Sequence, residues 1–229
     1  MKVVTEAHHV RKKQILDTAE KFFFEKGYAK TTISDIINKI DIANGTFYHY
    51  FKSKDDLLMA IIDRDVDASY ERISEIVNND NLTALEKINT IYESSFTSRI
   101  QNSDRTKLLL EVFYHNEDNI LFLHKRNLEF LKRITPLFSK MMDQGMEEGV
   151  FNFGSSRFTA ELILRMGNQL DEAFAKFMLK NPHSQEDKDT LFETYEAYSL
   201  AVHRLLGVEN GMLKIINRAS VEIFFDDNK

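Results

Sequence analysis

The segment Thr31–Lys54, TTISDIINKIDIANGTFYHYFKSK, predicts two short helices joined by a tight turn. Four isoleucines recur at helical spacing in its first half, and Thr32 with Asp35 forms the capping-box pattern that begins a helix. Asp41 follows, a residue type that tolerates the left-handed backbone of a tight turn. A second short helix fits residues 44–51. The segment therefore predicts a helix-turn-helix.

The second helix of this motif begins with small or polar residues, as a helix that approaches DNA bases requires. Gly45 lets the backbone come close, Thr46 offers a hydroxyl and a methyl group, and Asn44 can pair with adenine. We assign the two threonines at the start of the motif and the lysine at its end to phosphates. The candidate DNA-binding residues are Thr31, Thr32, Asn44, Gly45, Thr46, Tyr48, His49 and Lys54.

The aromatic residues between these candidates are expected to face the other way. Phe47, Tyr50 and Phe51 are predicted to pack against the preceding helix. An alternative is that the short helices form only a packed bundle, with the tyrosines as hydrogen-bond donors in its core.

The rest of the chain is predicted to be helical, with no alternating strand pattern. Gly27 supplies a left-handed cap after a first helix, and Ser53 with Asp56 predicts a capping box that opens a helix to about Val77. Further helices are expected at 82–100, 104–115, 119–148, 156–180 and in a last segment that ends at Gly207. Pro136 either kinks the helix at 119–148 or starts a second one.

The predicted fold class is therefore all-α. A three-helix head with the helix-turn-helix is expected at residues 1–54, and a larger helical body for ligand binding and dimerisation at residues 55–229. The helix after Ser53 is expected to be the only rigid link between them.

Composition narrows the classes of protein further. The chain has 229 residues, 43% of them hydrophobic, and no cysteine, which excludes a disulfide scaffold and a thiolate zinc site. Residues 1–54 hold ten Lys and Arg against six Asp and Glu, a net charge of +4, although the whole chain carries −6. A basic head on an acidic body is typical of a protein whose head alone meets a polyanion. No apolar run is long enough to span a membrane, so we expect a soluble cytoplasmic protein.

The head resembles the DNA-binding region of the TetR family of transcriptional regulators. The resemblance covers residues 11–62 and rests on glycines and aromatics at fixed offsets. It includes Ile15-Leu16, Ala19, Phe22, Gly27-Tyr28, Thr31-Thr32, Gly45-Thr46-Phe47-Tyr48, Phe51, Lys52-Ser53-Lys54 and Leu57. The family usually has glycine where Asp41 stands, and often a serine where Ala43 stands. Because Ala43 has no side chain that can cap a helix, the cap is expected to shift to Asn44.

The resemblance implies a repressor that a small-molecule ligand releases from a near-palindromic operator. It also implies a homodimer through the last two long helices, and the stripe Phe158, Leu162, Met166, Leu170, Phe174 and Phe177 fits that role. The alternative for this stripe is that it only fills the protomer core. A further alternative is an activator or chromosome-organising protein with no inducer.

The resemblance also implies a ligand cavity among the middle helices. The candidate ligand-binding residues are Tyr92, Phe96, Phe113, Phe122, Phe130, Met141 and Met166, with His124 or Gln169 as a polar anchor. The competing interpretation is that these aromatic residues and methionines are ordinary core.

An enzyme is not expected, because the chain has no nucleophile elbow, no phosphate-binding glycine loop and no His-Glu-x-x-His motif. No cofactor is expected. A metal site at His115 and His124, which flank an acidic turn, is the weaker alternative.

Overall fold

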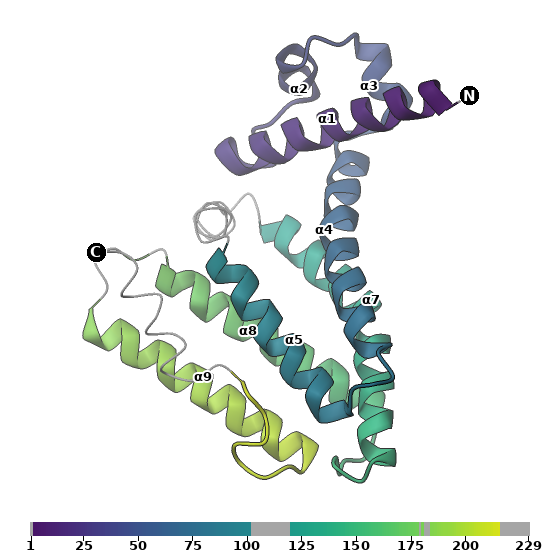
Figure 1. The fold of residues 1–229 in the computed structure, drawn as a ribbon. Helices are drawn as coiled ribbons and strands as arrows, with labels where there is room; N and C mark the ends of the chain where they lie inside the picture. The colour runs from purple at the N-terminus through teal and green to yellow at the C-terminus, as the bar shows by residue number, and fades with distance from the viewer. Residues whose placement is uncertain (1, 102–119, 179, 181–183, 216–229) are drawn as a thin grey trace. The chain divides into compact units, whose positions relative to one another are not determined.

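The structure, a computed structural model, describes residues 2–101, 120–178, 180 and 184–215, and all regular structure among them is helical (Figure 1). None of these described helices has the length and apolar character that a membrane span needs. The predicted helix at 104–115 lies outside the described residues. The helices are α1 (Lys2–Lys26), α2 (Ile33–Lys39), α3 (Asn44–Tyr50), α4 (Lys54–Val77), α5 (Ala84–Gln101), α7 (Ile120–Glu147), α8 (Ser156–Met178) and α9 (Gln185–Leu206).

The described residues form two compact units. The first contains residues 2–67 and 120–129, and the second contains 68–101 and the described residues from 130 onward. The first unit thus extends beyond residue 54 and includes the first half of α4. Both α4 and α7 run from one unit into the other. The expectation that α4 is the only helical link between head and body is therefore wrong.

The first unit is built around the inner face of α1. Ile15 and Ala19 on that helix are completely buried, and so are Ile36 on α2 and Phe47 on α3. Helix α4 contributes a continuous buried face with the residues Leu57, Leu58, Ile61, Ile62 and Val66. These side chains have the 3.6-residue spacing by which the sequence predicts amphipathic helices, and their burial fixes α2 and α3 against α1 and α4.

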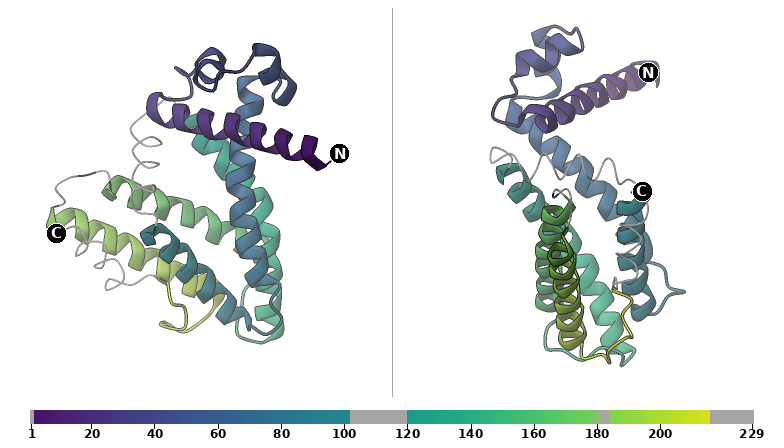
Figure 2. Two further views of the ribbon diagram at one scale, coloured as in Figure 1. Left: turned by 45° about the horizontal axis from the view of Figure 1, so that its top comes forward. Right: turned by 90° about the vertical axis from the view of Figure 1, so that its left-hand side faces the viewer.

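The second unit contains the most extensive contact between two helices among the described residues. Helices α8 and α9 lie side by side along their length (Figures 1 and 2). A capping box at Ser184 begins α9. The helix ends at Gly207, as predicted, and this glycine has the left-handed conformation at φ 67°. The side chains buried on the two helices include Ile163, Leu170, Phe174 and Phe177 on α8 and Leu191, Tyr195, Tyr198 and Val202 on α9.

Helix α7 settles the two alternatives for Pro136. It is a single helix from Ile120 to Glu147 with the proline inside it. Thr135 and Leu137 on either side are buried, whereas the proline itself is exposed. The ring therefore lies on the outer face of the helix. Proline has no backbone N–H to donate, so the missing hydrogen bond lies on this outer face and not on the packed one.

Candidate functional site

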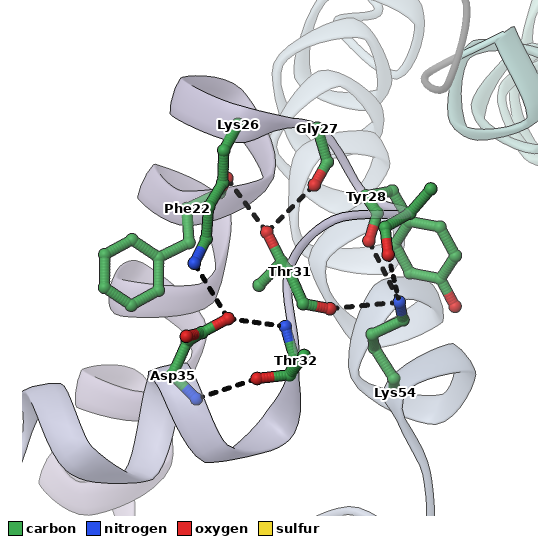
Figure 3. Close-up of polar contacts among 9 residues, drawn as sticks. Phe22, Lys26, Gly27, Tyr28, Thr31, Thr32, Asp35 and Lys54 are labelled. Carbon is green, nitrogen blue, oxygen red and sulfur yellow. Dashed lines mark hydrogen bonds and ion pairs between the residues drawn. The ribbon is translucent and has the colours of Figure 1, made fainter.

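Helix α2 begins at the predicted capping box (Figure 3). Asp35 N donates to Thr32 Oγ1 at 3.1 Å, and Thr32 N donates to the Asp35 carboxylate at 2.8 Å. The same carboxylate pairs with Lys26 Nζ at 2.7 Å. Lys26, and then the bonds from Thr32, lower the pKa of Asp35 to about 2. The start of α2 is therefore tied to the end of α1.

The turn between α2 and α3 adopts the left-handed conformation that the sequence predicts. Asp41 has φ 50° and is the only described residue other than glycine with a positive φ. Helix α3 then begins after Ala43, which is the N-cap and has no side-chain capping bond. Asn44 is the first residue of the helix, so the expectation that it replaces the missing cap is wrong. Its amide is exposed and is not used to cap the helix.

Helix α3 has two chemically distinct faces. Phe47 is completely buried and Phe51 is 2% exposed, so these rings hold the helix on the unit, as predicted. Asn44, Gly45, Tyr48 and His49 are exposed on the other face, and Thr46 and Tyr50 are half-buried. A Cβ built on Gly45 would have no atom within 4 Å. The outer face of α3 is thus polar, with open space over its glycine.

Two of the predicted DNA contacts have other partners. Thr31 is completely buried, and its hydroxyl lies 2.9 Å from the Gly27 carbonyl and 3.1 Å from that of Phe22. Its side chain therefore packs α2 against α1 and is not part of the exposed surface, which corrects its assignment to a phosphate. Lys54 Nζ lies at 2.9 Å from Tyr28 O and 3.0 Å from Thr31 O (Figure 3).

The structure adds one residue to this surface that sequence reasoning missed. The exposed imidazole of His8, on α1, lies 5.7 Å from the ring of His49 and 4.6 Å from the ring of Tyr50, both on α3. The basic residues that follow on α1 are the sequence signal that points to this end of the helix. The exposed surface of the head therefore includes the start of α1 beside the end of α3.

The predicted ligand-binding residues are only partly brought together. Tyr92 on α5 and Met166 on α8 are half-buried in the second unit, whereas Gln169 is exposed there and His124 is exposed in the first unit. Phe113 and His115 lie outside the described residues. For Phe96 on α5 and Phe122 on α7, only the place in the helix is described.

A pair of tyrosines across α5 and α9 was not predicted. The hydroxyl oxygens of Tyr92 and Tyr198 lie 2.9 Å apart, and either can donate to the other. A Cβ on Gly167 would lie 3.6 Å from the Tyr198 hydroxyl, so α8 approaches the pair at its glycine. Burial raises the pKa of Tyr92, which therefore keeps its proton and remains a hydrogen-bond donor. The two tyrosines are 106 positions apart in the sequence, so no local pattern could have predicted this contact.

Comparisons of the sequence with known proteins identify a matching family model and several relatives. Residues 15–61 match the family model described as "Bacterial regulatory proteins, tetR family". The chain is 26% identical over 141 residues to the fatty acid metabolism regulator protein of Bacillus subtilis, a match that covers 62% of this chain and 71% of that protein. It is 27% identical over 191 residues to the HTH-type transcriptional repressor KstR2 of Rhodococcus jostii, with 81% and 87% covered.

The fold also agrees with a solved structure over nearly the whole chain. A TetR-family transcriptional regulator from Syntrophomonas wolfei superposes with a TM-score of 0.65 at 21% identity, covering 88% of this chain and all of that one. The family model matches the segment that forms the exposed α3 face, and the structural likeness extends through the helical body. The chain is a DNA-binding transcriptional regulator of the TetR family.

Proposed function

We propose that the chain is a repressor that binds a near-palindromic operator as a homodimer and leaves it when a small molecule binds the body. The observation that carries the proposal is the outer face of α3, which is polar, exposed and open over Gly45. A helix of this kind can enter the major groove with its first residues against the base edges. Repression is proposed because relatives such as KstR2 are named repressors.

The exposed residues of the head suggest separate roles in DNA binding. Asn44, which caps nothing, can bond adenine in a bidentate manner, and Thr46 can contact a thymine methyl group. Tyr48 and His49 can donate to phosphates. The Thr32 hydroxyl accepts a bond from Asp35 N, and a hydroxyl that accepts can also donate, in this case to a phosphate.

The substitution Gly45→Ala tests the approach of α3 to DNA separately from the fold. The added methyl group meets no atom of the free protein, and alanine favours a helix over glycine by about 0.5–1 kcal/mol. The variant should therefore fold at least as stably as the parent. In the groove the methyl group separates the backbone from the bases, so DNA affinity should fall by roughly 1–3 kcal/mol per head.

The assay first selects duplexes from a random-sequence library with the parent protein and then measures their affinity by fluorescence anisotropy. Gly154→Ala is the matched control, because a Cβ there also meets no atom within 4 Å and the residue lies in the body. Parent-like affinity of Gly45→Ala on the selected duplexes would contradict the placement of α3 in the groove.

The proposed dimer interface is an exposed apolar surface on the last two helices. Phe158 and Leu162, one turn apart on α8, are 66% and 49% exposed, and Leu200 on α9 is 38% exposed. Large apolar side chains that remain exposed on one protomer favour an interface that covers them. Leu170, in contrast, is only 7% exposed and belongs to the protomer core. The predicted stripe on α8 thus divides between core and exposed surface, and its exposed end is the part available to a partner.

A twofold dimer would also explain why the proposed operator is near-palindromic. Two heads related by the twofold read half-sites about 34–36 Å apart, and the combined contacts give the affinity that one small head lacks. The surface on α8 and α9 supports an interface in which the same patch of each copy meets the other.

For the ligand, we propose a site in the second unit beside the hydroxyls of Tyr92 and Tyr198. Three helices meet at this pair, and a hydroxyl pair within apolar packing can fix the orientation of a bound molecule. A ligand releases DNA only if it prefers the state that binds DNA poorly. Genome-wide mapping of bound sites separates this proposal from a chromosome-organising role, because a repressor should occupy a few promoters.

A further inference from the structure

The ammonium group of Lys54 is fully engaged inside the first unit. It lies within hydrogen-bonding distance of three carbonyl oxygens of the α1–α2 loop, at 2.9 Å from Tyr28, 3.4 Å from Ala29 and 3.0 Å from Thr31. It also lies 4.3 Å from the centre of the Tyr28 ring. An ammonium group has three N–H donors. Three carbonyl partners leave none for a phosphate oxygen.

A second bond joins the same two segments. The Tyr28 hydroxyl donates to the carboxylate of Asp55, the residue after Lys54, at 2.5 Å. Burial, and then the neighbouring Asp55, raise the pKa of Tyr28, so its hydroxyl keeps the proton that it donates. Two consecutive residues in the first turn of α4 therefore hold Tyr28. Lys54 contacts the carbonyl and the ring of Tyr28, and Asp55 accepts a bond from the Tyr28 hydroxyl.

The loop held in this way determines where α2 begins. Thr31 N donates to the carbonyls of Gly27 and Tyr28 at 3.2 and 3.3 Å, and the Thr31 hydroxyl bonds the end of α1. Thr32, the next residue, is the N-cap of α2. A shift of the loop would therefore move the N-terminus of α2, and with it the turn and α3.

We propose that Lys54 is a positioning residue for DNA binding, which acts with Tyr28 and Asp55 to hold the α1–α2 loop and aim the helix-turn-helix. This assignment replaces the expectation of a direct phosphate contact, and it rests on the proposed binding of DNA by α3. The two roles differ in charge, because a phosphate contact requires the cation at the DNA and a clamp requires only that the loop keep its place.

Salt dependence separates these roles. Each phosphate contact by a cation contributes about 0.9 to the slope of log K against log salt. Lys54→Met should weaken the binding of a selected duplex about tenfold or more. The control is Lys52→Met, which removes an exposed charge two residues earlier. The salt slope of Lys54→Met should differ from that of the parent by no more than the slope of this control does. Tyr28→Phe, which removes no charge, should weaken binding about tenfold with an unchanged slope.

Amide hydrogen exchange of the free protein provides a readout that needs no DNA. In Lys54→Met and Tyr28→Phe the amides of residues 28–35 should exchange faster, whereas those of α8 and α9 should match the parent and Lys52→Met. If neither loop amides nor DNA affinity change in Tyr28→Phe, and Lys54→Met lowers the slope by about 0.9 per head, Lys54 is a phosphate contact and the clamp is wrong. If the parent binds no DNA while the exchange result holds, the proposed function fails and the clamp stands as a contact of the fold alone.

Discussion

Phe158 is the residue whose replacement tests the proposed dimer most directly. A phenylalanine buries about 150–250 Å² when it is enclosed. With 66% of Phe158 exposed, on the order of 130 Å² per copy remains for a partner to cover. At about 25 cal/mol per Å² this area corresponds to roughly 3 kcal/mol per copy, and the twofold counts it twice. Phe158→Ser should therefore weaken the dimer by up to roughly 6 kcal/mol, or about 10⁴-fold.

The measured loss should lie below this limit, because association recovers only part of the energy of the buried area. We expect a dimer dissociation constant that rises by at least about thirtyfold, which corresponds to the roughly 2 kcal/mol or more of an interface hot spot. The fold should be unaffected, since an exposed side chain contributes little to the core of the protomer. Sedimentation velocity from nanomolar to high micromolar concentration measures the constant directly.

Val10→Ser on α1 is the control, because Val10 is 62% exposed and belongs to the first unit, whereas α8 and α9 belong to the second. It should dimerise like the parent. Two results would refute the reasoning: a parent protein that sediments as a monomer at high micromolar concentration, or a Phe158→Ser variant as dimeric as Val10→Ser.

Two further predictions concern the head. The bond network lowers the pKa of Asp35 to about 2, so the stability it contributes is complete above the ordinary value of 3.8 and is lost as the pH falls through about 2. Asp35→Asn should thus lower Tm at neutral pH, and the difference from the parent should shrink toward pH 2; a constant difference would exclude the ionised pair with Lys26 as its cause. At Asp41, φ 50° favours glycine, so Asp41→Gly should raise the free energy of unfolding by up to about 1 kcal/mol in urea titrations, and a loss would show that the Asp41 side chain stabilises the turn.

The parts of the head that the sequence predicts correctly depend on neighbours within a few positions. The capping box pairs Thr32 with Asp35, and Gly27 and Asp41 have the positive φ expected at the ends of α1 and α2. Such features follow from the residue and its adjacent backbone, because no distant contact is needed to form them. The matching order of glycines and aromatics then identified the fold and the family.

Other features of the head and the body depend on partners far along the chain, which no local pattern reveals. Lys54 meets carbonyls 23 to 26 residues away, and no local pattern distinguishes such a lysine from one that faces DNA. The apolar stripe on α8 likewise cannot be interpreted fully from the sequence. Phe158 and Phe174 share one helical period, yet the first is exposed and the second is buried. Periodicity reveals an apolar face but not whether the same chain covers it.

The separation of the two faces of α3 has a consequence for how such regulators diversify. Phe47 and Phe51 anchor the helix and are buried, whereas Asn44, Gly45 and Tyr48 are exposed, with Tyr48 meeting the Phe47 ring edge-on. After a gene duplication, the exposed positions can therefore change at little thermodynamic cost, and a copy can acquire a new operator before its body acquires a new ligand. A library that varies these three positions and keeps both phenylalanines would consist mostly of folded proteins with altered DNA preference.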